Sequence, residues 1–225
     1  VVGPNQKAPY PGNNQSNAPC SGLGGRLSNC PYNLFRTSAD ITNTWASLLN
    51  NLNSTRPYQG TPPLSRPGAW AYADMLEVGR MGSLEEDRTM FGAWVIVSSP
   101  LILGHDVTNE TQNDRVWSVV AKPRAIGINQ AWHGHPGRFV RALDGALQLW
   151  AKPLSEFSHA AFVFNDDSTG STEPIAATID LTRDLGVPAG SAPRTKVYDV
   201  WGDRELAPPG PNGTFLTASL QPRDS

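Results

Sequence analysis

The sequence has few charged residues and almost no excess of either sign. Lys, Arg, Asp and Glu together make up 17% of the 225 residues, and the formal net charge is -2. A protein that binds nucleic acid or an anionic membrane surface usually has a clear basic excess. No apolar run reaches the roughly 18 residues that a membrane-spanning helix needs. We therefore expect neither nucleic acid nor a membrane among the partners of this protein.

Cysteine is scarce as well, with only Cys20 and Cys30. A pair at this spacing suits one short-loop disulfide, and two free thiols are the alternative. His133 and His135 alternate in a Gly/Pro-rich linker without a third ligand, so we predict no metal site. The glycine-rich stretch at 22–25 follows no strand and opens no helix, so it is not a phosphate loop. The sequence implies no redox or nucleotide cofactor.

Glycine and proline are abundant, at 21 and 20 residues, which is typical of a loop-rich globular protein. Four Asn-x-Ser/Thr sequons begin at Asn14, Asn53, Asn109 and Asn212. Together with the cysteine pair, they favour passage through the secretory pathway.

The chain divides into three segments that differ in composition and hydrophobic pattern. Residues 1–30 lack hydrophobic periodicity and are predicted to form a loop-rich N-terminal segment. Between 31 and 137, buried apolar strands alternate with helices, which indicates a parallel sheet in an α/β fold. The expected order is a strand ending near Arg36, a helix at 45–52, a strand at 68–79, a helix at 83–97, a strand at 100–104 and a helix at 113–120. A short apolar segment follows at 124–130.

From residue 138 to 225 the strands become short and regularly spaced. Turn residues separate them, which is typical of an antiparallel β domain, either a sandwich or a partial barrel. Strands are expected at 138–143, 146–151, 160–164, 176–181 and 197–201.

Polar residues gather where the first two strands end. Arg36 and Asp40 lie at the end of the first strand, and Asp74 lies in the second. The junction between a strand and the next helix is where an α/β barrel keeps its chemistry. The alternative for Asp40 is a surface carboxylate paired with Arg36.

Five blocks in a fixed order resemble glycoside hydrolase family 27, the α-galactosidase (melibiase) family. They are Arg36-x-x-x-Asp40-Ile, Trp70-x-x-x-Asp74-Met-Leu-Glu-Val-Gly79, Ser99-Pro-Leu-Ile-Leu-Gly-His-Asp106, Ala125-Ile-Gly-Ile-Asn-Gln130, and Val140 to Trp150-Ala-Lys-Pro-Leu154. The resemblance covers roughly residues 34–201. It implies the C-terminal half of a (β/α)8 TIM barrel, strands six to eight, followed by an antiparallel β-sandwich.

The resemblance also implies an enzyme, a retaining glycosidase that releases terminal α-D-galactose from a galactose-containing carbohydrate. Asp40 occupies the position of the proton donor, which protonates the leaving oxygen and then acts as a base on water. Arg36, Asp74 and Met75 match residues that bind the sugar. A disulfide is known near this place in the family, so the resemblance implies a Cys20–Cys30 pairing. The family's nucleophile belongs to strand four, which the chain does not match.

Departures from the family leave alternatives open. The family usually has Asn-Asp-Pro at the positions of Ala71, Tyr72 and Ala73. The protein could therefore instead have the sugar specificity of an α-N-acetylgalactosaminidase or a β-L-arabinopyranosidase. A non-catalytic carbohydrate-binding protein is a further alternative. Because strands one to four are unmatched, we expect a fragment of a secreted or lysosomal/vacuolar enzyme. We expect that fragment alone to be inactive and prone to aggregate through its open sheet edges.

Overall fold

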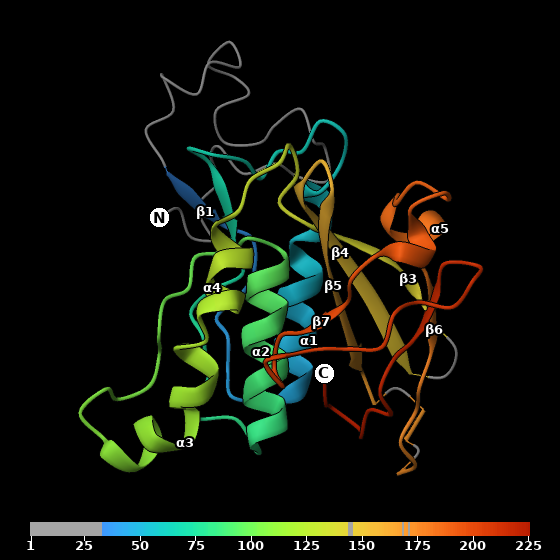
Figure 1. Cartoon of the computed structure of the whole chain (residues 1–225). Coiled ribbons are helices and arrows are strands. Elements are labelled where there is room, and N and C mark those ends of the chain that lie inside the picture. The colour runs from blue at the N-terminus through green and yellow to red at the C-terminus, as the bar shows by residue number, and fades with distance from the viewer. Residues whose placement is uncertain (1–32, 144–145, 168, 171) are drawn as a thin grey trace.

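A computed structural model describes residues 33–143, 146–167, 169–170 and 172–225. The expected N-terminal loop segment, the two cysteines and the Asn14 sequon lie outside the described residues. In Figure 1 a helical part with a small parallel sheet stands beside an antiparallel sheet and a set of short C-terminal strands.

The parallel sheet begins with β1 (Leu34–Arg36) and β2 (Trp70–Tyr72), which pair in register from Leu34↔Trp70 to Arg36↔Tyr72. This confirms the expected parallel order. The second strand is shorter than the predicted 68–79, because Asp74 adopts a positive φ of 84° and ends the extended run. The predicted strand at 100–104 is reduced to one parallel bridge between Leu76 and Leu103.

Four helices belong to the helical part. They are α1 (Trp45–Ser54), α2 (Leu84–Ile96), α3 (Glu110–Val120) and α4 (Pro123–Gln130), with a short 3-10 turn η4 (Arg56–Tyr58) after the first. Helix α2 contacts the other three. The predicted cap of α2 is confirmed: the Ser83 hydroxyl accepts from Glu86 N at 3.2 Å, and the Glu86 carboxylate accepts from Gly82 N at 2.9 Å. The apolar segment at 124–130 is a helix, which Pro123 opens at a position where no N–H is needed.

The antiparallel part contains a three-stranded sheet in the order β3-β4-β5 and two two-stranded sheets. Its elements are β3 (Arg138–Ala142), β4 (Leu147–Ser155), β5 (Ser158–Asn165), β6 (Thr178–Asp180), α5 (Leu181–Leu185), η5 (Ala192–Arg194), β7 (Tyr198–Asp199), β8 (Arg204–Glu205) and β9 (Thr214–Leu216). All five predicted strand regions contain a strand, and β6 pairs with β9 while β7 pairs with β8. Residue 181 opens α5 rather than ending a strand, since Asp180 caps that helix through its carboxylate.

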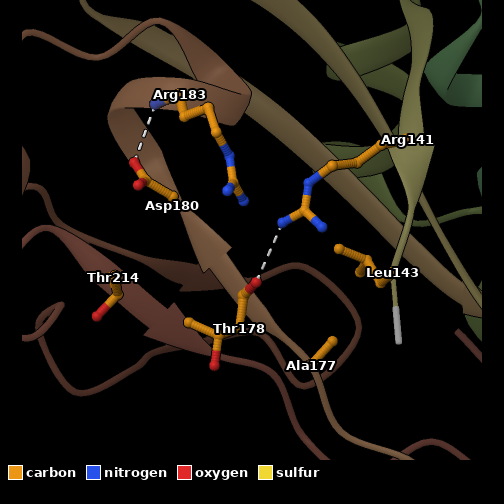
Figure 2. Close-up of a pocket in the computed structure, with 7 residues that line it drawn as sticks. All are labelled: Arg141, Leu143, Ala177, Thr178, Asp180, Arg183 and Thr214. Carbon is orange, nitrogen blue, oxygen red and sulfur yellow. Dashed lines mark hydrogen bonds between the residues drawn. The ribbon is translucent and has the colours of Figure 1, made fainter. Parts of the chain in front are cut away.

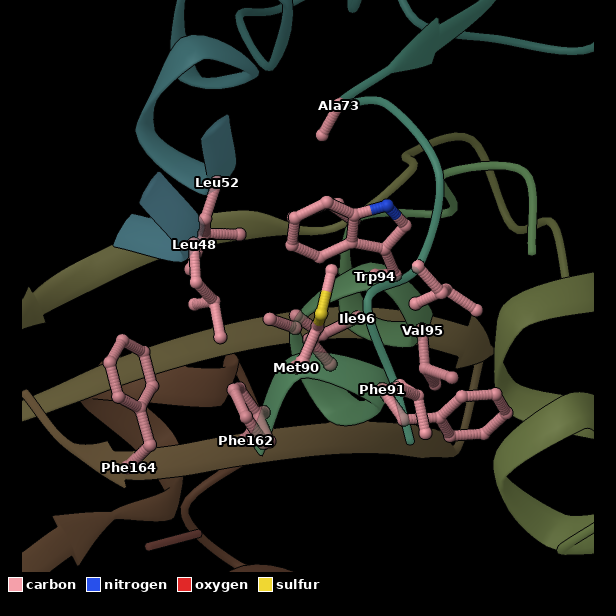
Figure 3. Close-up of a cluster of buried hydrophobic side chains, with 14 of the residues drawn as sticks. Leu48, Leu52, Ala73, Met90, Phe91, Trp94, Val95, Ile96, Phe162 and Phe164 are labelled. Carbon is pink, nitrogen blue, oxygen red and sulfur yellow. The ribbon is translucent and has the colours of Figure 1, made fainter. Parts of the chain in front are cut away.

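Helix α2 is the centre of the main core and is buried on nearly every side, as expected of a helix that is covered by several layers. Met90 and Trp94 are fully buried there and belong to one cluster with Leu48 of α1 and with Phe162 and Phe164 of β5. Figure 3 shows this cluster, with the β5 rings lying below the α1 leucines and beside α2. The helical part and the β part therefore share one core.

The junction between the two parts is closely packed. Gly137 has a φ of 109°, and a Cβ there would lie 1.7 Å from the carbonyl oxygen of Ile96. Lys152 of β4 is fully buried and donates to Ser98 Oγ at 2.7 Å and to the Asn129 carbonyl at 2.9 Å. Because the packing crosses residue 137, the division of the chain at that point stays a prediction.

Candidate active site

The site is built at the edge of the sheet where β1 and β2 end. Arg36 is the last residue of β1, Asp40 follows four residues later, and Asp74 comes two residues after β2. The strands are parallel and in register, so the segments that follow them leave the sheet at the same edge. The structure thus brings together the three charged residues that the sequence singled out.

Hydrogen bonds hold Asp74 in place next to this edge. Its side chain is only 13% exposed, and Oδ1 accepts from Met75 N at 2.9 Å while Oδ2 accepts from Ile41 N at 2.8 Å. Its backbone carbonyl accepts the indole N–H of Trp94 at 2.7 Å. These hydrogen bonds compensate for the left-handed backbone at a non-glycine residue.

Arg36 links the two carboxylates. Its Nη2 donates to Asp74 Oδ2 and lies 2.7 Å from Asp40 Oδ1, while its side chain is 15% exposed. The side chain of Asp40, in contrast, is 90% exposed. The surface ion pair considered for Asp40 is therefore present, and it holds a solvent-accessible carboxylate at the sheet edge through a partly buried guanidinium.

Hydrogen bonds to backbone carbonyls fix the two strand ends relative to each other. The buried amide of Asn51 donates to Ala73 O at 3.0 Å and to Ala39 O at 3.3 Å, and Ser38 Oγ donates to Ala73 O at 3.2 Å. The sequence motifs did not single out Asn51 for this role. The available signal was its position three residues after the buried Leu48, which places an amide on the inward face of α1.

Tyr72 and Met75 flank Asp74 in the sequence. Burial raises the pKa of Tyr72 to about 12, the charge of Asp74 adds to that shift and Arg36 opposes it, so the phenol stays neutral. Met75 is partly buried and packs against the main core. Tyr72 occupies one of the positions where the sequence departs from the resembled family.

Two other polar residues at this end of the sheet have local structural contacts. His105 is buried and its Nε2 lies 3.0 Å from Asn113 Oδ1. The exposed Asp106 accepts from the N–H and the hydroxyl of Thr108, at 2.9 and 2.7 Å. These contacts order the loop before α3.

The described part of the chain offers no group of three or more His, Cys, Asp or Glu side chains that could hold a metal ion. His135 uses both ring nitrogens in protein contacts, with Gln59 O at 2.9 Å and Gly137 N at 3.1 Å. No helix in the described part has the length and apolarity needed to cross a bilayer.

Two family models match this chain. The model described as "Alpha galactosidase A" matches residues 26–131, and the model described as "Alpha galactosidase C-terminal beta sandwich domain" matches residues 144–225. The chain belongs to the α-galactosidase (melibiase) family. The resemblance that the five sequence blocks suggested is thereby confirmed.

Individual family members agree with this assignment. An α-galactosidase of Oryza sativa subsp. japonica is 31% identical over 85% of this chain and 42% of its own length. An α-N-acetylgalactosaminidase of Homo sapiens is 32% identical over 59% of this chain and 32% of its own length. This chain therefore spans less than half the length of either relative.

The fold also has a solved counterpart. The crystal structure of α-galactosidase I from Mortierella vinacea superposes with a TM-score of 0.66 at 20% identity, over 88% of this chain and 54% of that one. Together with the two family models, this confirms the expected fold class, part of a TIM barrel followed by an antiparallel β domain.

Proposed function

We propose that this chain carries the acid/base part of a retaining glycosidase that releases terminal α-D-galactose from a galactose-containing carbohydrate. The observation that supports it most is the placement of Asp40, an exposed carboxylate beyond the end of β1 that Arg36 contacts at 2.7 Å. The family assignment and the name of the rice relative agree with this activity.

Asp40 is proposed as the general acid and base. In the first step its carboxyl protonates the departing glycosidic oxygen, and in the second its carboxylate takes a proton from water. Both steps need a side chain that substrate and water can reach, and the 90% exposure of Asp40 meets that need. The nucleophile would be a second carboxylate about 5–5.5 Å away.

Arg36, Asp74 and Met75 are proposed to bind the sugar. The Nε–H of Arg36 is buried without a partner among the described residues, so its guanidinium has unused donor capacity. Asp74 is not proposed as the nucleophile, because backbone N–H groups and Arg36 occupy both of its oxygens. Within the proposed sugar site, Asp74 also orients Arg36.

The test is Asp40→Asn in the protein translated from the complete transcript. We expect hydrolysis of unactivated galactosides to fall by about 100-fold or more, the upper part of what general acid–base catalysis contributes. An aryl galactoside with a good leaving group still forms the glycosyl-enzyme. Azide then attacks that intermediate from the face that water normally uses, so the product is α-galactosyl azide.

Asp106→Asn is the matched control, because Asp106 is an exposed aspartate in the loop before α3 whose carboxylate accepts hydrogen bonds from Thr108 alone among the described residues. We expect this variant to hydrolyse both substrates at close to the wild-type rate. Full activity of Asp40→Asn on unactivated galactosides would refute the assignment of Asp40.

A second specificity, α-N-acetylgalactosaminidase, is supported by the name of the human relative. Comparing kcat/KM for the aryl α-galactoside and the aryl α-N-acetylgalactosaminide distinguishes the two, and an aryl β-L-arabinopyranoside covers the third family activity. Sugar binding without turnover of any of these substrates would instead favour a non-catalytic carbohydrate-binding protein.

We also propose that the protein follows the secretory pathway to a secreted or lysosomal/vacuolar location. Two of its sequon asparagines, Asn53 and Asn212, are exposed, which glycosylation requires. Asn109 is exposed too, although its amide oxygen accepts from Gln112 N as the cap of α3.

A further inference from the structure

The β part contains a cavity of about 320 Å³ that shares no residue with the site around Asp40. It opens between β3, β6, β9 and α5, as Figure 2 shows. Arg141 enters it from β3 and Arg183 from α5, and their guanidinium groups face each other across the space. Its volume is at the lower end of the range for small-molecule sites, about 300–1,000 Å³.

The two guanidiniums converge because they share one buried carboxylate. Asp184 is 2% exposed and accepts from Arg141 Nε and Nη2, both at 2.9 Å. It also accepts from Arg183 Nε at 3.0 Å and Nη2 at 3.3 Å. Burial opposes the ionisation of Asp184, but these hydrogen bonds and the Asp180 N–H outweigh it and hold the pKa of that carboxyl well below its usual range.

Donor capacity remains on the cavity side of this cluster. Neither Nη1 of Arg141 nor Nη1 of Arg183 donates to a described residue, and each carries two N–H groups. The hydroxyl-bearing residues Thr178 and Thr214 also line the cavity. An oxyanion that accepted from both guanidiniums would form charge-assisted hydrogen bonds, the stronger class.

The lining also contains one carboxylate, that of Asp180. Its Oδ1 already accepts from the N–H groups of Thr182 and Arg183 at 3.0 and 2.9 Å. Its other oxygen would repel a bare anion that filled the cavity but could accept from a ligand hydroxyl. Among the described residues that line the cavity there is no aromatic side chain on which a sugar ring could stack.

We propose that this cavity is a second ligand site, for a monosaccharide-sized molecule that carries both hydroxyl groups and one anionic group, a carboxylate or a phosphate ester. The anionic group lies between Arg141 and Arg183, and the hydroxyls contact Asp180 and the two threonines. This inference does not depend on the proposed hydrolysis, since none of its residues belongs to the site around Asp40.

The experiment is calorimetric titration of the protein from the complete transcript with D-glucuronate and with glucose 6-phosphate. Neither contains a galactose ring, so we expect neither to bind at the proposed active site. Glucose and inorganic phosphate are titrated as the neutral sugar and the bare anion. We expect binding of at least one acidic sugar, weakened about tenfold or more by Arg183→Gln, and little or no binding of the two comparison ligands.

Arg183→Gln should fold, because Arg183 is 62% exposed and Arg141 keeps its two-point contact with Asp184. Arg194→Gln is the matched control for charge, since Arg194 is an exposed arginine of η5 outside the cavity. It should bind the acidic sugars like wild type. Thr214→Val tests the hydroxyl contacts without changing charge and should also weaken binding.

Three results would overturn the proposal. One is the absence of binding for both acidic sugars. Another is inorganic phosphate binding as tightly as glucose 6-phosphate, which would indicate an adventitious anion only. The third is equal weakening by Arg183→Gln and Arg194→Gln, which would indicate a general charge effect rather than this cavity.

Discussion

Gly92 on α2 offers a sharp test of how the helical part packs on the β part. A Cβ at this position would lie 2.4 Å from Cε2 of Phe162 and 3.0 Å from two other ring atoms. Carbon atoms normally pack about 3.5–4.0 Å apart, so the ring would have to move by roughly 1 Å. It has little room, because Phe162 is 7% exposed and its ring lies 5.4 Å from that of Phe164.

Gly92→Ala therefore has two opposed effects. Alanine stabilises a helix interior by up to about 1 kcal/mol relative to glycine, whereas overpacking a core costs typically about 1–3 kcal/mol. Gly127→Ala on α4 isolates the first effect, since a Cβ there meets nothing within 4 Å. We expect Gly127→Ala to stabilise the protein and Gly92→Ala to be about 1–3 kcal/mol less stable than it.

Urea unfolding of both variants, followed by tryptophan fluorescence, measures this difference. A third variant, Phe162→Leu, makes room beside residue 92. Because residue 92 meets this ring, Phe162→Leu should cost less in the Gly92→Ala background than in wild type, with a coupling of about 0.5–3 kcal/mol. Equal stability of Gly92→Ala and Gly127→Ala, together with zero coupling, would refute the packing of α2 against β5.

Two further predictions concern buried charges. Burial lowers the pKa of Lys152 to about 8, so between pH 8 and pH 10.5 the unfolded chain binds more protons. The free energy of unfolding of wild type relative to Lys152→Met should then rise with pH, by up to about 3 kcal/mol. A difference between the two proteins that did not change with pH would contradict this prediction. Asp184→Asn leaves Arg141 and Arg183 without their shared carboxylate. We expect a loss of about 2–3 kcal/mol at neutral pH, less than for a fully buried pair because both arginines are partly exposed. Arg183→Gln should cost under about 1 kcal/mol. Equal losses of stability for Asp184→Asn and Arg183→Gln in chemical denaturation would contradict the role of Asp184 as the shared partner of both arginines.

Local patterns in the sequence determined much of this protein. The capping residues of α2, the apolar faces of the helices and the spacing of the short β strands act over a few residues, so they predicted the elements and their order. The sequence likewise placed Arg36 and Asp40 at the end of one strand, four residues apart, and they form an ion pair. The five ordered blocks indicated the family that the family models then confirmed.

Tertiary structure alone decided which distant groups meet. Arg36 reaches Asp74 across 38 positions, and the indole of Trp94 holds the Asp74 carbonyl, because strand register and helix packing bring those segments together. The cavity lined by Arg141 and Arg183 likewise needs four elements from separate parts of the β region. No local periodicity encodes such contacts, since they depend on how whole segments pack.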